Sequence, residues 1–246
     1  MYNLLIAFAV GVAVTVAVRL AGFPLLAGLI PGVLAFIGTY VLLARRIAKR
    51  LEGLVNAAKK ELESINPRSP QRDRDAKVAK AVKTLEQGLQ YDRWQPMVAS
   101  QVHGQIGILH YMMKDYTAAE PHLAQASKRD AMSQAMRGAL FYQRKDYPKM
   151  TDAFERAVKV GKKENILWAA YAWCLQQSKE RDKAIGVLGR AVAANPSDEK
   201  LKASLTQLQN DKRMKMKAYE PMWWQFGLEQ PPPEVAGGRR VQFQRR

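Results

Sequence analysis

The chain begins with two long apolar stretches separated by a short break. Residues 3–20 and 23–44 contain one charged side chain, Arg19, and each stretch is long enough to cross a bilayer as a helix. One helix through both would be far too long, and the break favours a tight turn. The pattern predicts a transmembrane helical hairpin over residues 1–44. A cleavable signal peptide is the alternative, although no Lys or Arg precedes the first stretch.

Small residues recur at helical spacing inside this predicted hairpin. Ala9, Ala13 and Ala17 lie four residues apart, and Gly28 and Gly32 form a GxxxG pattern. Small residues at this spacing let membrane helices approach closely. We expect them to pack the two spans against each other, with dimerisation in the membrane as the alternative.

The pattern after residue 44 predicts a basic amphipathic helix over residues 45–66, next to the membrane. Apolar residues from Ile47 to Leu62 mark one face of this helix, and basic residues mark the other. We expect the helix to bind anionic lipid at the membrane surface, or to dock its apolar face onto the following domain. The residues assigned to the membrane surface are Arg45, Arg46, Lys49, Arg50, Lys59 and Lys60.

The spacing of small and aromatic residues predicts three helix pairs, over residues 97–130, 131–163 and 165–195. The clearest pair is GILHYMMKDYTAAEPHLAQA, residues 107–126, which reads as two short helices joined by a turn. Ala119, Met150 and Ala184 occupy matching places in successive pairs, 31 and 34 residues apart. Spacings of this length are typical of helical repeats, in which one pair cannot bury its own apolar face.

Two further helices flank the predicted pairs. One covers residues 73–90, and a more polar one over residues 197–217 would close the end of the stack. The predicted helical domain therefore spans residues 71–217.

The helix pairs resemble the tetratricopeptide repeat (TPR) family over residues 100–196. The family has a small residue and aromatic residues in the first helix of each pair, then Ala, an aromatic residue and Ala in the second helix, and Pro at the end. Met150 and Arg181 depart from the pattern, because a small and an aromatic residue are usual there. The matching positions are Gly107, Tyr116, Ala119, Leu123 and Ala126, then Gly138, Phe141, Tyr147, Phe154 and Ala157, then Trp168, Ala172, Ala184, Leu188, Ala191 and Pro196.

The resemblance implies an α-solenoid of antiparallel helix pairs, with a concave groove lined by the first helix of each pair. The groove lacks the Lys, Arg and Asn with which some family members bind a C-terminal carboxylate, and its apolar character suits an apolar peptide or an amphipathic helix. Two alternatives stay open: these side chains pack against neighbouring helices, or the C-terminal aromatic segment fills the groove. The positions assigned to the groove are Gln101, Ile108, Tyr111, Met112, Met132, Tyr142, Gln143, Ile166, Trp173, Gln176 and Gln177.

The last part of the chain, residues 218–246, combines an aromatic segment with a tail rich in Pro, Gly and Arg. Trp223, Trp224 and Phe226 are costly to leave in water, so we expect them to pack on the chain's own helices. A protein partner or a membrane interface is the alternative site for them. An irregular tail is predicted over residues 231–246.

The charge of the chain bears on its partners and its location. The 39 basic and 22 acidic residues give a net charge of +17, which permits anionic lipid or nucleic acid as a partner. The basic residues are spread along the chain rather than gathered with aromatic residues, so a nucleic-acid partner is disfavoured. The basic cluster after the second span predicts a multi-pass protein of the bacterial inner membrane with both termini in the cytoplasm.

No pattern in the sequence indicates catalysis, a metal site or a cofactor. His103 and His110 are seven residues apart, too far to ligate one metal from the same helix. The single cysteine, Cys174, lies in an apolar helical stretch and excludes an intramolecular disulfide. There is no glycine-rich phosphate loop and no nucleophile elbow. We therefore expect no enzyme activity and no cofactor.

Together these patterns predict an all-α protein, with a transmembrane hairpin followed by a TPR-like solenoid. Its expected function is that of a membrane-anchored scaffold or adaptor that binds a protein partner on the cytoplasmic side, within a larger membrane complex. A structural protein that self-assembles into a homo-oligomer is the alternative. A tether for nucleic acid or for an anionic membrane is a third and weaker hypothesis.

Overall fold

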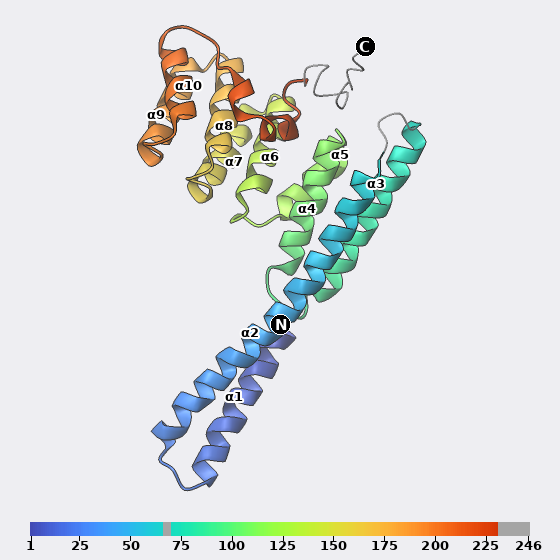
Figure 1. The fold of residues 1–246 in the computed structure, drawn as a ribbon, viewed down its shortest axis with the longest axis vertical. Helices are drawn as coiled ribbons and strands as arrows, with labels where there is room; N and C mark the ends of the chain where they lie inside the picture. Colours follow the sequence, from blue (N-terminus) through green and yellow to red (C-terminus); the bar gives the residue numbers. More distant parts are fainter. Residues whose placement is uncertain (66–69, 231–246) are drawn as a thin grey trace, which may run out of the picture. The chain divides into compact units, whose positions relative to one another are not determined.

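A computed structural model describes residues 1–65 and 70–230 of the chain, and every regular element in this part is helical (Figure 1). The predicted all-α class is confirmed for these residues. The chain divides into two compact units, Met1–Ile106 and Gly107–Arg246. The predicted tail over residues 231–246 lies outside the described residues.

The first unit contains a long helical hairpin followed by shorter elements. The helix α4 begins in this unit and ends in the second. The elements are α1 (Tyr2–Leu20), α2 (Leu25–Glu63), α3 (Gln71–Glu86), the 3-10 helix η1 (Gln87–Tyr91) and α4 (Val98–Met112).

Two helices at the N-terminus, α1 and α2, are long and apolar enough to cross a membrane, with a mean hydropathy of 2.1 in their most apolar windows. They pack tightly through glycines. A Cβ atom on Gly11 would lie 2.9 Å from the carbonyl oxygen of Gly32, and one on Gly28 would lie 3.0 Å from the carbonyl oxygen of Thr15. The two glycines of the GxxxG pattern are therefore used inside the hairpin.

The alanine stripe of α1 does not take part in this contact. Ala9, Ala13 and Ala17 are exposed, and the buried residues of α1 are Asn3, Ala7 and Gly11. The expectation that the alanines pack the hairpin is therefore wrong. Glycine allows two helix backbones to approach more closely than alanine does. The face of α1 that contains Gly11 therefore packs on α2, and the face with the three alanines points away from it.

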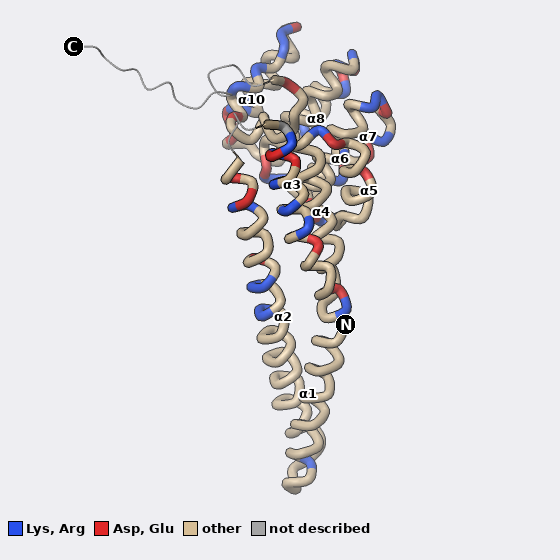
Figure 2. Tube along the Cα trace, turned by 90° about the vertical axis from the view of Figure 1, so that its right-hand side faces the viewer, with Lys and Arg blue, Asp and Glu red and all other residues tan. Residues whose placement is uncertain are grey.

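The helix α2 continues without a break from its apolar half into its polar half. The second predicted span and the predicted juxtamembrane helix are thus one helix of 39 residues. At 1.5 Å per residue this helix is about 58 Å long, roughly twice the thickness of the hydrocarbon core of a bilayer. Figure 2 shows charged residues along its polar half and none along its apolar half.

The polar half of α2 packs against α3, which runs alongside it (Figure 1). Ile47 and Ala58 of α2 are buried, as are apolar residues of α3 such as Ala81. Lys80 of α3 reaches Glu61 of α2, with 2.6 Å between Nζ and Oε1. Of the two expectations for this apolar face, docking onto the following helices is therefore the arrangement in the structure.

The second unit consists of short helices in antiparallel pairs. Contacts join α6 to α7, α8 to α9 and α9 to α10. The elements that follow α4 are α5 (Tyr116–Gln125), α6 (Ala131–Gln143), α7 (Tyr147–Val160), α8 (Asn165–Gln177), α9 (Arg181–Ala194), α10 (Glu199–Gln209), and the 3-10 helices η2 (Met216–Tyr219) and η3 (Met222–Phe226).

Four turns in this unit share one backbone geometry; three of them join the two helices of a pair, and the fourth, at Asp211, ends α10. Lys114, Lys145 and Lys179 have φ angles of 63°, 60° and 65°, in the left-handed region. Each donates its amide N–H to the carbonyl three residues back, and the next residue donates to the carbonyl five residues back. This pair of bonds is the Schellman motif that ends a helix. The same turn geometry thus recurs in this unit at intervals of 31, 34 and 32 residues.

Aspartates begin the helices after two of these turns. Asp115 accepts a hydrogen bond from the amide of Ala118, and Asp146 accepts one from the amide of Lys149. These bonds satisfy amides that have no partner within the first turn of a helix. In the third turn, Arg181 replaces the aromatic residue of the pattern, and its Nε donates to the carbonyl of Leu208 at 3.0 Å.

The last predicted helix is shorter than expected. The prediction covered residues 197–217, but α10 ends at Gln209. Asp211 there adopts a left-handed φ of 56° and forms an ion pair with Arg181. Arg181 thereby binds the end of α10, and the chain turns back toward α8.

The helix α8 forms the centre of the second unit. All its residues from Ile166 to Leu175 are buried, because α6, α7, α9 and α10 surround it together with η2 and η3. Close packing within a pair depends on small residues: a Cβ atom on Gly138 of α6 would lie 2.6 Å from the ring of Phe154 on α7.

A matched pair of glycine substitutions tests this packing. Gly138→Ala is expected to destabilise the fold by about 1–3 kcal/mol, because the added methyl group overpacks the contact with Phe154. Gly186→Ala on α9 meets nothing within 4 Å and should be neutral, or stabilising by up to about 1 kcal/mol. Urea denaturation of both variants followed by circular dichroism measures the difference. Equal effects of the two substitutions would contradict the packing described here.

Candidate docking surface and the segment that covers it

An aromatic surface joins the first helices of the pairs in the second unit. Tyr142 of α6 and Trp173 of α8 meet edge to face, with ring centroids 5.6 Å apart. Trp173 in turn meets Trp223 of η3 at 5.2 Å. Edge-to-face pairs of this kind are the arrangement that aromatic rings prefer. The contacts therefore connect the predicted groove directly to the C-terminal aromatic segment.

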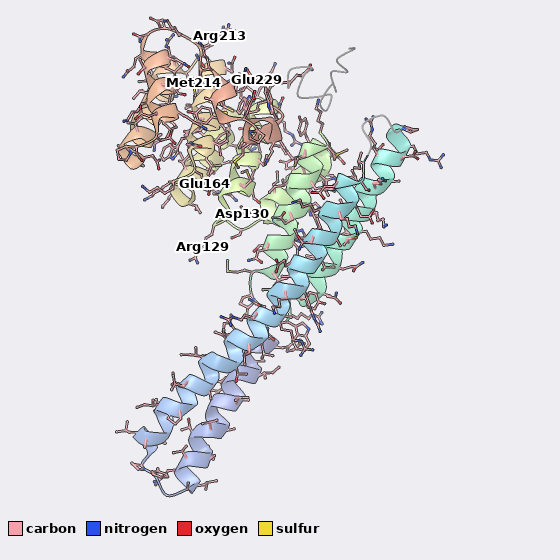
Figure 3. All side chains as sticks on the ribbon, viewed as in Figure 1. Arg129, Asp130, Glu164, Arg213, Met214 and Glu229 are labelled. Atoms are coloured by element: carbon pink, nitrogen blue, oxygen red, sulfur yellow. The ribbon has the colours of Figure 1, made fainter. Side chains whose placement is uncertain are left out.

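The covering segment, defined here as residues 214–228, is buried against this surface. Trp223 and Phe226 are 1% and 0% exposed, and Met214, Met216 and Tyr219 belong to the same hydrophobic cluster. The segment starts after α10 and reaches α8 through η2 and η3. Figure 3 labels Met214, where the segment begins, and Glu229, which follows its end and accepts a hydrogen bond from the indole of Trp223.

Polar contacts fix the segment at both ends. The hydroxyl of Tyr111 on α4 donates to the carbonyl of Phe226 at 2.6 Å, in a buried setting. At the other end, the side-chain oxygen of Gln176 accepts from the amide of Met214 at 3.4 Å. In the middle, the hydroxyls of Ser204 and Tyr219 lie 2.9 Å apart and are buried. The segment is therefore held by specific hydrogen bonds as well as by apolar burial.

The predicted groove residues fall into three classes by burial. Tyr111, Ile166 and Trp173 are buried. Ile108, Met132, Tyr142 and Gln176 are half-buried, and Met112, Gln143 and Gln177 are exposed. Gln101 is exposed and belongs to the first unit. The structure thus brings Tyr111, Tyr142, Trp173 and Gln176 together beneath the covering segment, which is the arrangement that one of the two open alternatives described.

The prediction missed Met214, Met216 and Tyr219 as parts of this surface. Their signal was weak, because they alternate with lysines at positions 215 and 217. That alternation, followed by a Trp-Trp pair, could have indicated a segment that is buried on one side and solvated on the other.

Burial controls the ionisation of the groups at this surface. It raises the pKa of Tyr111 far above the usual value for tyrosine, and that of Tyr219 to about 12. Burial also raises the pKa of the Cys174 thiol, which is fully enclosed. Because the charged forms are disfavoured, both phenols stay neutral, and the hydroxyl of Tyr111 keeps the proton that it donates to the carbonyl of Phe226. The thiol of Cys174 is unreactive for the same reason.

The residues predicted to lie at the membrane surface do not lie at one level. Arg45, Arg46, Lys49 and Arg50 occupy the first turns beyond the apolar half of α2 and are exposed. Lys59 and Lys60 follow about 20 Å further along the same helix, at 1.5 Å per residue. The first four therefore lie close together at the start of the charged half of α2, whereas the last two lie near its far end.

A hollow elsewhere in the second unit lies beside α7 and α9, and most of the residues that line it carry a charge. It has a volume of about 460 Å³, and its lining includes Glu155, Trp168 and Arg190. The Arg190 guanidinium binds Glu155 with distances of 2.5 and 3.0 Å and holds the pKa of that carboxyl below its usual range. Tyr171 also donates to Glu155, at 3.1 Å. The polar groups of this cluster form hydrogen bonds with one another. We therefore interpret the cluster as a structural link between α7 and α9.

Among the described residues, no group of three or more His, Cys, Asp or Glu side chains could hold a metal ion.

No family model matches the chain, and no curated protein matches it either. The resemblance to the TPR family therefore depends on the residues named above.

The hydrogen bond from Tyr111 offers a direct test of how the segment is held. Tyr111→Phe keeps the ring and leaves the carbonyl of Phe226 buried without its donor, which should cost about 1–3 kcal/mol. Tyr147→Phe is the control, because Tyr147 is exposed and its loss of a hydroxyl should change the free energy of unfolding by less than about 0.5 kcal/mol. Urea denaturation measures both. A Tyr111→Phe effect no larger than that of the control would argue against the bond.

Proposed function

We propose that this protein is a membrane-anchored scaffold, in which a TPR-like helical domain presents a peptide-binding surface on the cytoplasmic side of a bacterial inner membrane. The anchor would be the hairpin of α1 and α2. The binding surface would be the aromatic inner face of α4, α6 and α8. The partner would be a protein that supplies an apolar, aromatic segment.

The observation that carries this proposal is the way the aromatic face holds the covering segment. A short, mostly non-α-helical stretch lies on it, inserts Trp223 and Phe226, and is bound at its ends by Tyr111 and Gln176. Peptide ligands of helical grooves bind with the same elements, namely a few buried anchors and hydrogen bonds to the peptide backbone. The covering segment therefore acts as an internal ligand, and its chemistry indicates what a partner would need to offer.

The orientation rests on the distribution of basic residues. Arg45, Arg46, Lys49 and Arg50 follow the second span directly, whereas Arg19 stands alone at the opposite end of the hairpin. The positive-inside rule favours the cytoplasm for the side with the larger cluster. Arg19 donates to the carbonyl of Phe23 across the tight turn, which suits a residue at the short end of a hairpin.

Separation of the covering segment from its surface tests the proposal. A chain truncated after Arg213 is prepared in detergent micelles, and a fluorescent peptide of residues 212–230 is titrated into it. Saturable binding is expected, measured by fluorescence anisotropy. A peptide carrying Trp223→Ala and Phe226→Ala should bind at least about tenfold more weakly, because buried aromatic anchors dominate the binding of such segments.

Two controls make this result decisive. Circular dichroism establishes whether the truncated chain keeps its helices, and Trp173→Ala in the truncated chain should weaken binding of the unaltered peptide. A folded truncated chain that does not bind the peptide contradicts the proposal. So does a truncated chain that unfolds, since the segment would then be an obligatory part of the fold and the surface would not exchange ligands.

A further inference from the structure

The loop between η1 and α4, residues 92–97, lies against the first turn of α1. The amide of Tyr2 donates to the carbonyl of Arg93 at 2.9 Å, and the amide of Asn3 donates to the carbonyl of Trp94 at 3.1 Å. The first amides of a helix have no partner within the helix, and this loop supplies partners for two of them. The rings of Tyr2 and Trp94 meet edge to face, with centroids 5.3 Å apart. The loop is therefore fixed to the N-terminal end of the first apolar helix.

The packing of α1 on α2 sets the level of this junction. Gly11 lies against Gly32 and Phe36, so in an antiparallel hairpin Tyr2 lies level with the residues just before Arg45. This is where the apolar half of α2 ends and its charged half begins. The 19 residues of α1 span about 28 Å, close to the thickness of the hydrocarbon core. The loop is thus placed at one boundary of the apolar hairpin.

The side chains of the loop match the chemistry of a membrane interface. Trp94 and Met97 are 41% and 48% exposed, although both are large and apolar. Arg93 is exposed beside them, and Arg50 places its guanidinium over the ring of Tyr91 at 5.7 Å. Tryptophan and tyrosine are favoured at the headgroup level of a bilayer, and basic side chains nearby are attracted to anionic headgroups.

We propose that residues 92–97 form a second contact of this chain with the membrane, in which Trp94 and Met97 enter the headgroup region of an anionic leaflet. The proposal requires that α1 and α2 span the bilayer. It goes beyond the proposed scaffold role, because it assigns lipid contact to a loop that lies outside α1 and α2. The polar half of α2 and the adjoining α3 then extend away from the bilayer, with Lys60 roughly 22 Å beyond Arg45 at 1.5 Å per residue.

The depth of single labelled positions tests this proposal. The full chain carrying Cys174→Ala is reconstituted into vesicles of phosphatidylethanolamine and phosphatidylglycerol. Single cysteines are introduced by Trp94→Cys, Met97→Cys, Leu34→Cys or Lys60→Cys, and each is labelled with the fluorophore NBD. Quenching is compared between lipids that carry a nitroxide at the headgroup and lipids that carry it deep in the acyl chain.

We expect labels at positions 94 and 97 to be quenched by the headgroup nitroxide several-fold more than the label at position 60. The label at position 34, on the exposed face of the second span, should be quenched most by the deep nitroxide. Labels at 94 and 97 that behave like the label at 60, while position 34 is quenched, would overturn the loop contact alone. A loop covered by a second copy of the chain or by another protein would give this same result.

Absence of quenching at position 34 would show that the spans are not in the bilayer. That result would overturn the membrane anchor of the proposed function together with the loop contact. The two proposals therefore fail in distinguishable ways.

Discussion

The second unit depends on the burial of Trp223 and Phe226 against the aromatic surface that includes Tyr142 and Trp173. Helix pairs alone leave the first helix of each pair with one uncovered face, and here that face carries Tyr142 and Trp173. Full burial of one such aromatic side chain contributes about 2–3 kcal/mol, a large share of the stability of a small domain. The covering segment thus makes α8 a buried central helix. For the same reason, any partner on this surface must replace contacts that the chain already makes with itself.

The first unit depends on the continuity of α2. Because α2 does not break after its apolar half, its apolar and charged halves are parts of one helix, and α3 packs against the charged half. Glycine contacts at Gly11, Gly28 and Gly32 fix the register of α1 on α2, and this register places the loop that binds the first turn of α1. A hairpin packed in this way has used its glycines internally, so self-assembly in the membrane would need another surface.

Local patterns allowed much of the fold to be predicted. The apolar stretches, the three helix pairs and the aspartates at the turns depend on residues that are close in sequence, so period and turn chemistry reveal them. The candidate site was predicted less well. Tyr111, Tyr142 and Trp173 could be assigned to one surface by register, but its cover could not, because the contact of Tyr111 with Phe226 joins residues 115 positions apart. The role of Arg181 could not be predicted for the same reason, because it bonds to Leu208, which is distant in sequence. The repeat pattern has an aromatic residue at this position.

The function proposed for this chain turns on whether the aromatic face is occupied by the chain's own segment. The most direct measurement is a nuclear Overhauser effect between the indole rings of Trp173 and Trp223, whose centroids lie 5.2 Å apart. It can be recorded on the full chain in micelles with labelled tryptophan, and the two rings are assigned with Trp173→Phe and Trp223→Phe. A strong cross-peak between the two rings is expected if the covering segment lies on this surface. An absent cross-peak, together with rapid solvent exchange of the Trp223 indole N–H, would contradict this placement of the segment.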